Sequence, residues 1–135
     1  MRIASIIFLL VFLSIKSQAQ TTSQMVDEAH KELDKAEERL NTVYKRILEL
    51  YKKDTLFISK MRKAERLWIQ FRDAEIEMKY PHMGTLDYGQ EGRICLVEYK
   101  LELTEARERK LRQWLVRNID ETNHCNGSVG RYKDE

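Results

Sequence analysis

The sequence predicts an all-α protein, an antiparallel bundle of three long helices followed by a disordered C-terminal tail. Two observations support this fold class. Apolar residues recur every three or four positions through most of the chain, which is the period of an amphipathic helix. The single Pro and three of the five Gly lie in one short segment, residues 80–92. No segment alternates apolar and polar residues as a half-buried strand does.

The composition of the 135 residues fits one domain and excludes several functional classes. There are 24 Lys and Arg against 22 Asp and Glu, and without Arg2 and Lys16 of the N-terminal segment 22 basic residues remain. Balanced charge argues against binding of nucleic acid or anionic lipid by net charge alone. Two Cys are too few for a disulfide-rich scaffold, and no Gly-rich phosphate-binding loop occurs in the sequence.

Residues 1–19 have the features of a secretory signal peptide. Arg2 gives a positive start, residues 3–15 are apolar except for two serines, and the small residues Ser17 and Ala19 precede a cleavage site. The apolar run is shorter than the roughly 20 residues that a spanning helix needs. We expect cleavage after Ala19, no stable membrane span afterwards, and a periplasmic or extracellular protein. An uncleaved membrane anchor is the alternative.

The first helix is predicted from about Ser23 to Lys52. Its apolar residues alternate spacings of three and four over eight positions, which is a heptad pattern. These positions are Val26, Ala29, Leu33, Ala36, Leu40, Val43, Ile47 and Leu50. Thr22 or Ser23 can cap this helix, and Asp54 with Thr55 interrupts the pattern and caps the next one.

The second helix is predicted from about Thr55 to Lys79, because the stripe resumes there and stops before Pro81, which cannot continue a helix. Its apolar positions are Phe57, Met61, Ala64, Trp68, Phe71 and Met78. Glu75 occupies the one polar position of this stripe.

A long loop is predicted over residues 80–92, followed by a third helix to about Ile119. The apolar positions of this helix are Ile94, Val97, Leu101, Thr104, Leu111 and Leu115. Residues 120–135 contain almost no apolar residue, so we expect a loose tail after a helical domain of residues 20–119. At 1.5 Å per residue each helix is roughly 40 Å long, which makes the domain a rod.

The two cysteines, Cys95 and Cys125, are candidates for a disulfide in an exported protein. An unbroken third helix carries the chain about 36 Å from Cys95 to Ile119, and six further residues can return at most about 20 Å. A disulfide needs Cα atoms within about 7 Å. An internal bond therefore requires both flanks to fold back, and intermolecular pairing or free thiols are the alternatives.

The sequence gives no catalytic or metal site, and we expect a protein that is not an enzyme and needs no cofactor. The pairs Asp27/His30 and Glu121/His124 have a spacing that can share a metal on a helix. However, the first pair flanks the apolar stripe and faces water, and the second lies beyond the third helix. No Ser, Cys or Thr lies in a nucleophile motif, and no pair of carboxylates occupies an apolar setting.

The most informative segment is residues 67–74, where aromatic residues of the stripe are followed directly by charges. Trp68 and Phe71 lie on the stripe, and Arg72 and Asp73 flank it. We expect these charges to form a half-buried polar network that fixes the register of the helices, with contact to a ligand as the alternative. Candidate partners on the neighbouring helices are Asn41, Tyr44, Thr104 and Arg107.

A motif pattern runs through all three predicted helices. It comprises Leu40-Asn41-x-x-Tyr44, Ala64-x-x-x-Trp68-x-x-Phe71-Arg72-Asp73-Ala74, Tyr88-Gly89 and Leu103-Thr104-x-x-Arg107-x-x-x-Leu111. This pattern resembles the LprI-like N-terminal domain, a family named for a lysozyme inhibitor, over about Ser23 to Leu115. The resemblance implies a small exported helical domain that binds and inhibits lysozyme. Two positions at which family members commonly carry Cys are here about Glu28 and Ile76, which implies that one disulfide is missing.

Two functions are consistent with these features. The first is an exported binding protein that inhibits lysozyme by protein contact, and because lysozyme cleaves with two carboxylates in a cleft, an inhibitor must cover or fill that cleft. We expect the long loop to do so, since aromatic and Arg side chains are the usual anchors of interfaces. The candidates are Tyr80, His82, Asp87, Tyr88 and Arg93. The alternative is a structural or interaction module of the cell envelope, without inhibitory activity, which forms a homodimer or docks a partner helix through its heptad stripe.

Overall fold

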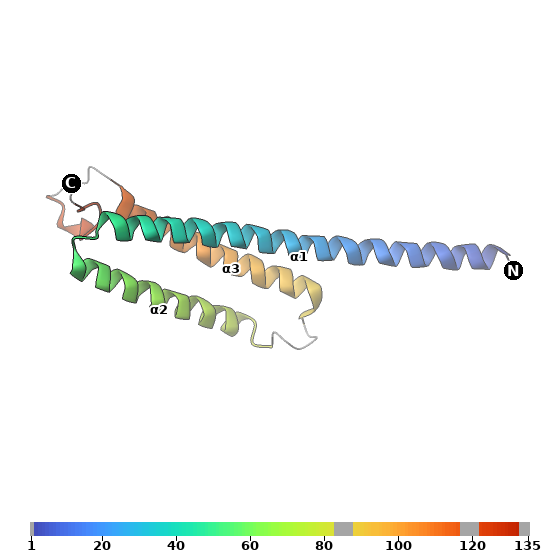
Figure 1. Cartoon of the computed structure of the whole chain (residues 1–135). Helices are drawn as coiled ribbons and strands as arrows, with labels where there is room; N and C mark the ends of the chain where they lie inside the picture. The colour runs from blue at the N-terminus through green and yellow to red at the C-terminus, as the bar shows by residue number, and fades with distance from the viewer. Residues whose placement is uncertain (1, 83–87, 117–121, 133–135) are drawn as a thin grey trace.

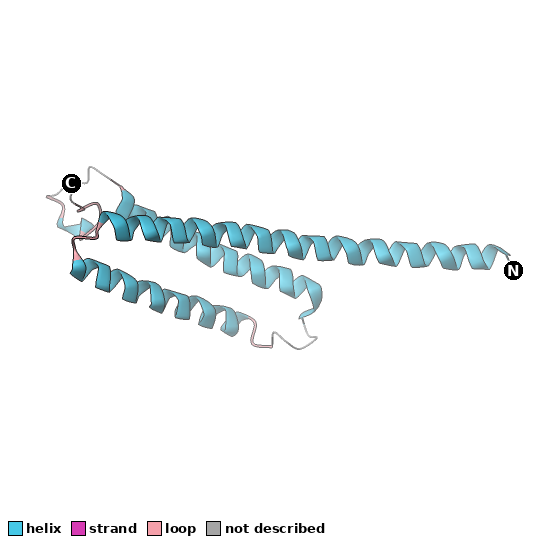
Figure 2. Cartoon of the chain, viewed as in Figure 1, coloured by secondary structure: helices cyan, strands magenta, loops and turns pink. Residues whose placement is uncertain are grey.

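The computed structural model describes residues 2–82, 88–116 and 122–132, with side chains described from Thr22 onward. Within these residues the chain forms three long helices, α1 (Arg2–Leu50), α2 (Thr55–Lys79) and α3 (Gly89–Leu111), and no strand. Two short 3-10 helices follow, η2 (Arg112–Leu115) and η3 (His124–Asn126). The predicted all-α fold with three long helices is confirmed (Figure 2).

The three helices run up, down and up (Figure 1). On the facing sides of α2 and α3, Glu75 contacts Tyr99 near one end and Glu65 contacts Arg107 two to three turns away. From the first contact to the second, the residue numbers fall on α2 and rise on α3, which is the pairing of two antiparallel helices. α3 packs closely against the C-terminal half of α1, whereas α2 approaches α3 at fewer places.

The helix ends agree with prediction where a local signal sets them. α2 has the predicted bounds, and the Asp54 carboxylate caps it by accepting a hydrogen bond from the Phe57 amide at 2.9 Å. α1 differs, because it is continuous from Arg2 and not from about Ser23. Neither Pro nor Gly occurs before Pro81, so nothing in the backbone interrupts the helix between the apolar N-terminal run and the heptad stripe. The N-terminal part of α1 extends beyond α2 and α3 (Figure 1).

The third helix begins earlier than predicted and is followed by a tighter turn. α3 starts at Gly89, whose φ of 58° is a conformation that glycine adopts at little cost and that turns the chain into the helix. The α-helix ends at Leu111 and tightens into η2, in which Trp114 and Leu115 pack against the core. The prediction of a helix to about Ile119 was wrong, because the α-helix ends at Leu111 and the backbone is already extended at Val116; Ile119 itself lies outside the described residues.

The hydrophobic core lies where the C-terminal half of α1 meets the start of α2 and the end of α3. Tyr51 is almost completely buried there, and its ring stacks on Phe57 with centroids 4.2 Å apart. The heptad stripe of α1 is buried from Leu33 to Ile47, as predicted. The buried cluster comprises Leu40, Val43, Ile47, Tyr51, Met61 and Leu111.

The inner face of α2 matches the predicted stripe only in part, since Phe57, Met61 and Trp68 face the core. Ala64, Phe71 and Met78 are exposed, with 57% of Phe71 and 69% of Met78 accessible to solvent. Met61, Glu65, Trp68 and Arg72 face the other helices instead. The prediction for Ala64, Phe71 and Met78 was wrong. Glu65 and Arg72, the residues after Ala64 and Phe71, face inward, so charged side chains take part in the interior contacts.

The C-terminal segment returns to the end of α1. The sequence predicts a loose tail for residues 120–135, whereas residues 122–132 form turns held against the core. The Tyr51 hydroxyl donates to the Ser128 carbonyl at 2.9 Å, and the Trp114 indole donates to the Ser128 hydroxyl at 3.1 Å. The Tyr132 ring lies edge-on to Tyr51, with centroids 5.4 Å apart. Hydrogen bonds and the Tyr132 ring therefore anchor a segment that has few apolar residues.

The two cysteines are exposed and unpaired, so the internal disulfide considered for them is not formed. Cys95 lies near the start of α3, and Cys125 lies in η3, after the other end of that helix. In the described part of the chain, no helix combines the length and the apolar character needed to cross a membrane.

Candidate functional site

A buried ion pair joins α2 to α3 at the centre of the bundle. Two nitrogens of the Arg107 guanidinium donate to one oxygen of Glu65, at 3.0 and 2.8 Å. Both side chains are largely buried, and the guanidinium also lies 5.6 Å from the centre of the Trp68 ring. The Glu65 carboxylate thus neutralises the Arg107 charge and the Trp68 ring stabilises the cation, which makes its burial tolerable.

A second ion pair joins α2 to α1. Arg72 pairs with Glu37 at 3.4 Å and with its neighbour Asp73 at 2.9 Å, and its guanidinium lies 5.2 Å from the Trp68 ring centre. Lys100 of α3 also pairs with Glu37, at 3.1 Å. The predicted polar network around Arg72 therefore exists, and it ties all three helices together.

The partners of this network differ from those that the sequence suggested. Arg72 and Asp73 form no hydrogen bond or ion pair with Asn41 or Tyr44 among the described residues. Thr104 is completely buried, but its hydroxyl donates to the Lys100 carbonyl of its own helix at 2.8 Å. The acidic partners Glu37 and Glu65 were missed because, in sequence, they are two of many Glu between apolar positions. Only their distance from an Arg on another helix distinguishes them.

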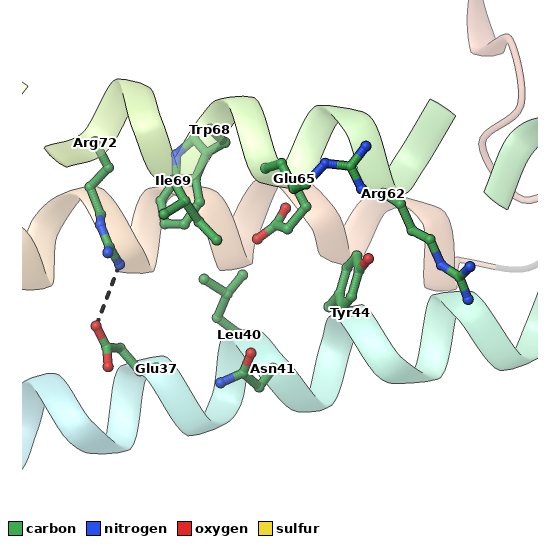
Figure 3. A pocket seen from close by; sticks show the side chains of 10 residues that line it. Glu37, Leu40, Asn41, Tyr44, Arg62, Glu65, Trp68, Ile69 and Arg72 are labelled. Atoms are coloured by element: carbon green, nitrogen blue, oxygen red, sulfur yellow. Dashed lines mark hydrogen bonds and ion pairs between the residues drawn. The ribbon is translucent and has the colours of Figure 1, made fainter. Parts of the chain in front are cut away.

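These side chains border a groove between α1 and α2 (Figure 3). Its volume is about 460 Å³. Leu40 and Ile69 point toward each other across it, and Glu37 and Arg72 close one end with their ion pair. The lining residues are Glu37, Leu40, Asn41, Tyr44, Arg62, Glu65, Arg66, Trp68, Ile69 and Arg72. Five residues of the motif pattern line the groove, namely Leu40, Asn41, Tyr44, Trp68 and Arg72.

The other end of the α2–α3 hairpin carries a cluster of tyrosines. The rings of Tyr80 and Tyr88 meet edge to face with centroids 5.8 Å apart, and Tyr99 lies 6.5 Å from Tyr80. The Lys79 ammonium lies 3.5 Å from the centre of the Tyr99 ring. The Tyr99 hydroxyl donates to Glu75 at 3.1 Å, and this hydrogen bond raises the pKa of Tyr99. Desolvation raises the pKa of Tyr80.

The structure therefore brings together two of the five predicted partner-binding residues, Tyr80 and Tyr88. His82 and Arg93 are exposed near them along the chain, and Asp87 lies outside the described residues. Lys79 and Tyr99 belong to the same cluster and were missed by the sequence reasoning. Lys79 is the last residue of α2 and Tyr99 lies within α3, so nothing in the sequence indicated that the two side chains share a site.

The chain matches the family model "Lysozyme inhibitor LprI" over residues 14–111. This match covers most of α1, all of α2 and all of α3. The chain belongs to the LprI family. Searches of curated proteins and of solved structures gave no significant match.

The match to the LprI family agrees with where the residues of the motif pattern lie in this fold. Trp68, Arg72 and Arg107 lie in the polar interior that joins the helices, and Tyr88 lies in the tyrosine cluster. The described residues of this LprI protein contain no group of three or more His, Cys, Asp or Glu that could hold a metal ion. The geometry offers two surfaces for non-covalent contact. One is the groove between α1 and α2, and the other is the end of the α2–α3 hairpin that carries Tyr80, Tyr88 and Tyr99, here called the tyrosine end.

Proposed function

We propose that this LprI protein is exported and inhibits a lysozyme by direct protein contact. The observation that carries the proposal is the family match over residues 14–111. The shape of the molecule supports it. α2 ends at Lys79 and α3 begins at Gly89, and the exposed residues Pro81 and His82 lie at this end of the hairpin, which can enter or cover a cleft.

The tyrosine end has the side chains that such a contact needs. Tyr80 and Tyr88 are half-buried and their rings contact each other, and tyrosine is one of the residue types that usually anchor an interface. Lys79 and Arg93 place exposed positive charge at the same end of the hairpin. A lysozyme cleft contains two catalytic carboxylates, and Lys79 and Arg93 carry the opposite charge, although the exposed acids Glu91 and Glu98 lie in the same part of α3.

The test is the rate at which lysozyme clears a cell-wall suspension, measured with the purified protein in molar excess. We expect inhibition, and we expect Tyr80→Ser with Tyr88→Ser to reduce it at least tenfold. Leu56→Ser is the matched control, because Leu56 is 68% exposed at the opposite end of α2. Unchanged lysozyme turnover with the wild-type protein would rule the proposal out. Equal inhibition by the double variant and the wild type would exclude the tyrosine end as the contact.

Export is a separate part of the proposal and rests on residues 1–19, whose composition is that of a signal peptide. We expect the protein recovered outside the cytoplasm to begin at Gln20, as measured by N-terminal sequencing. Recovery only with Met1 intact would contradict cleavage. This result would leave the inhibition test unaffected.

A second candidate function is a homodimer or a complex with a partner helix in the cell envelope. The heptad stripe of α1 is occupied within the molecule, so the available face is the outer side of α2. Leu67 and Phe71 are 53% and 57% exposed there, and Leu56 and Met78 extend the same face toward both ends of the helix. Light scattering tests the dimer, since a strictly monomeric mass at high concentration would exclude it.

A further inference from the structure

The α1–α2 groove has an uneven distribution of charge. Its two acids are both engaged, Glu65 by Arg107 and Glu37 by Arg72 and Lys100. Its remaining cations, Arg62 and Arg66, have no hydrogen-bond or ion-pair partner within the described part of the chain. The end of the groove opposite the Glu37–Arg72 pair therefore carries two uncompensated positive charges.

The geometry of these two arginines suits a carboxylate. They lie four residues apart on α2, so their side chains leave neighbouring turns on the same side of the helix. A guanidinium presents a planar fork of N–H donors that matches the two oxygens of a carboxylate. Figure 3 shows Arg62 reaching from α2 toward α1, where Tyr44 lies opposite. Like Arg62 and Arg66, the Asn41 amide and the Tyr44 hydroxyl form no hydrogen bond with the described residues, and both are available as further donors.

The middle of the groove is apolar. Leu40 lines it from α1, and Ile69, which is 41% exposed, lines it from α2. A ligand that fits the whole groove therefore has a carboxylate beside an apolar group. An acidic peptide segment with a neighbouring aliphatic residue has this chemistry, and the volume of about 460 Å³ accommodates a few side chains.

The same contacts argue against a saccharide as the ligand. Sugars are usually held by an open aromatic face and by free carboxylate acceptors for their hydroxyls. Here the Trp68 ring is already in contact with Arg72 and Arg107, and neither Glu37 nor Glu65 is free. The groove thus offers donors and an apolar surface, which is the complement of an acidic peptide.

We propose that the groove between α1 and α2 binds an acidic segment of a protein partner, with Arg62 and Arg66 holding its carboxylate and Leu40 and Ile69 contacting its apolar side chain. The site lies on a different face from the tyrosine end. It does not depend on the partner being a lysozyme, so it stands or falls separately from the proposed inhibition.

The experiment is fluorescence anisotropy of a labelled synthetic peptide, in which two adjacent Glu are flanked by Leu, titrated with the full chain. We expect micromolar binding that weakens at least tenfold in the double variant Arg62→Gln with Arg66→Gln. The matched control is Lys60→Gln with Lys63→Gln, which removes the same charge from exposed positions of the same helix outside the groove. This control should change binding less than threefold. A peptide with Gln in place of both Glu should bind at least tenfold more weakly.

Four results would overturn the proposal. Equal losses in the two double variants would show that general electrostatic attraction, and not the groove, binds the peptide. Equal binding of the Glu and Gln peptides would show that no carboxylate is recognised. The absence of binding at millimolar protein, or preferential binding of a muramic acid-containing disaccharide, would show that the ligand class is wrong. Arg62 and Arg66 are exposed, and circular dichroism of each variant verifies that the fold is retained.

Discussion

The strongest stability prediction concerns the ion pair between Glu65 and Arg107. Arg107→Met keeps most of the aliphatic stem but removes the guanidinium, which leaves the Glu65 carboxylate without a partner. Only 11% of that side chain is exposed, and it loses two hydrogen bonds at once. Removing one partner of a fully buried pair costs about 3–5 kcal/mol. Because Glu65 borders the groove and some water can reach it, we expect a loss of about 3 kcal/mol in the free energy of unfolding.

Urea unfolding, followed by circular dichroism at 222 nm, measures this loss. The matched control is Arg109→Met on the same helix, where 67% of the side chain is exposed and the nearest carboxylate is 4.0 Å away. Exposed pairs of this kind contribute little, so the control should cost less than about 0.5 kcal/mol. Replacing both partners, as Glu65→Leu with Arg107→Met, should recover most of the loss. A loss below about 1 kcal/mol in Arg107→Met, or a double variant as unstable as the single, would refute the assignment of a buried pair.

Two further predictions concern the ends of the bundle. Tyr51→Phe removes the hydroxyl that donates to the Trp114 and Ser128 carbonyls, and it should cost about 1–3 kcal/mol in urea unfolding. Burial raises the pKa of Tyr51, so the folded state keeps this proton longer than the unfolded state, and stability should fall only as pH rises above about 10. Tyr51→Phe should reduce that alkaline fall in urea midpoints measured from pH 8 to 11, and an unchanged pH profile would contradict the assignment. Gly92→Ala places a Cβ 2.3 Å from the Tyr88 Cβ, so Tyr88 must move, and a loss of about 1–3 kcal/mol with a weaker near-ultraviolet tyrosine signal is expected. Glu91→Ala, which changes an exposed neighbour, should leave the free energy of unfolding and the near-ultraviolet tyrosine signal unchanged.

Helix boundaries could be predicted from sequence where a local signal sets them. α2 begins after the Asp54 cap and ends before Pro81, and both residues act on the backbone next to them. The end of α3 and the course of the tail could not be predicted in this way. They depend on hydrogen bonds from Tyr51 and Trp114 to Ser128, which join residues far apart in the chain.

The orientation of α2 could be predicted only in part, for a physical reason. Trp68 and Met61 lie inward on any choice of apolar stripe, but Phe71 and Arg72 compete for the next inward position. Arg72 takes it because Glu37 is within reach on α1 and Trp68 offers its ring. The pattern of α2 alone contains no information about Glu37. The motif residues of the site were therefore identified from sequence, whereas their partners were not.

The polar interior explains why both proposed surfaces exist in the same molecule. By placing Arg72 inside, α2 turns Leu67 and Phe71 to the solvent, which creates the exposed apolar face. The same orientation puts Arg62 and Arg66 at the groove and leaves them without acidic partners among the described residues, because Glu65 is already bound to Arg107. An apolar interior could slide or rotate with little change in contacts, but two directional ion pairs fix α2 in one register against its neighbours. The interior charges thus act indirectly on binding, because they determine which side chains of α2 reach a partner.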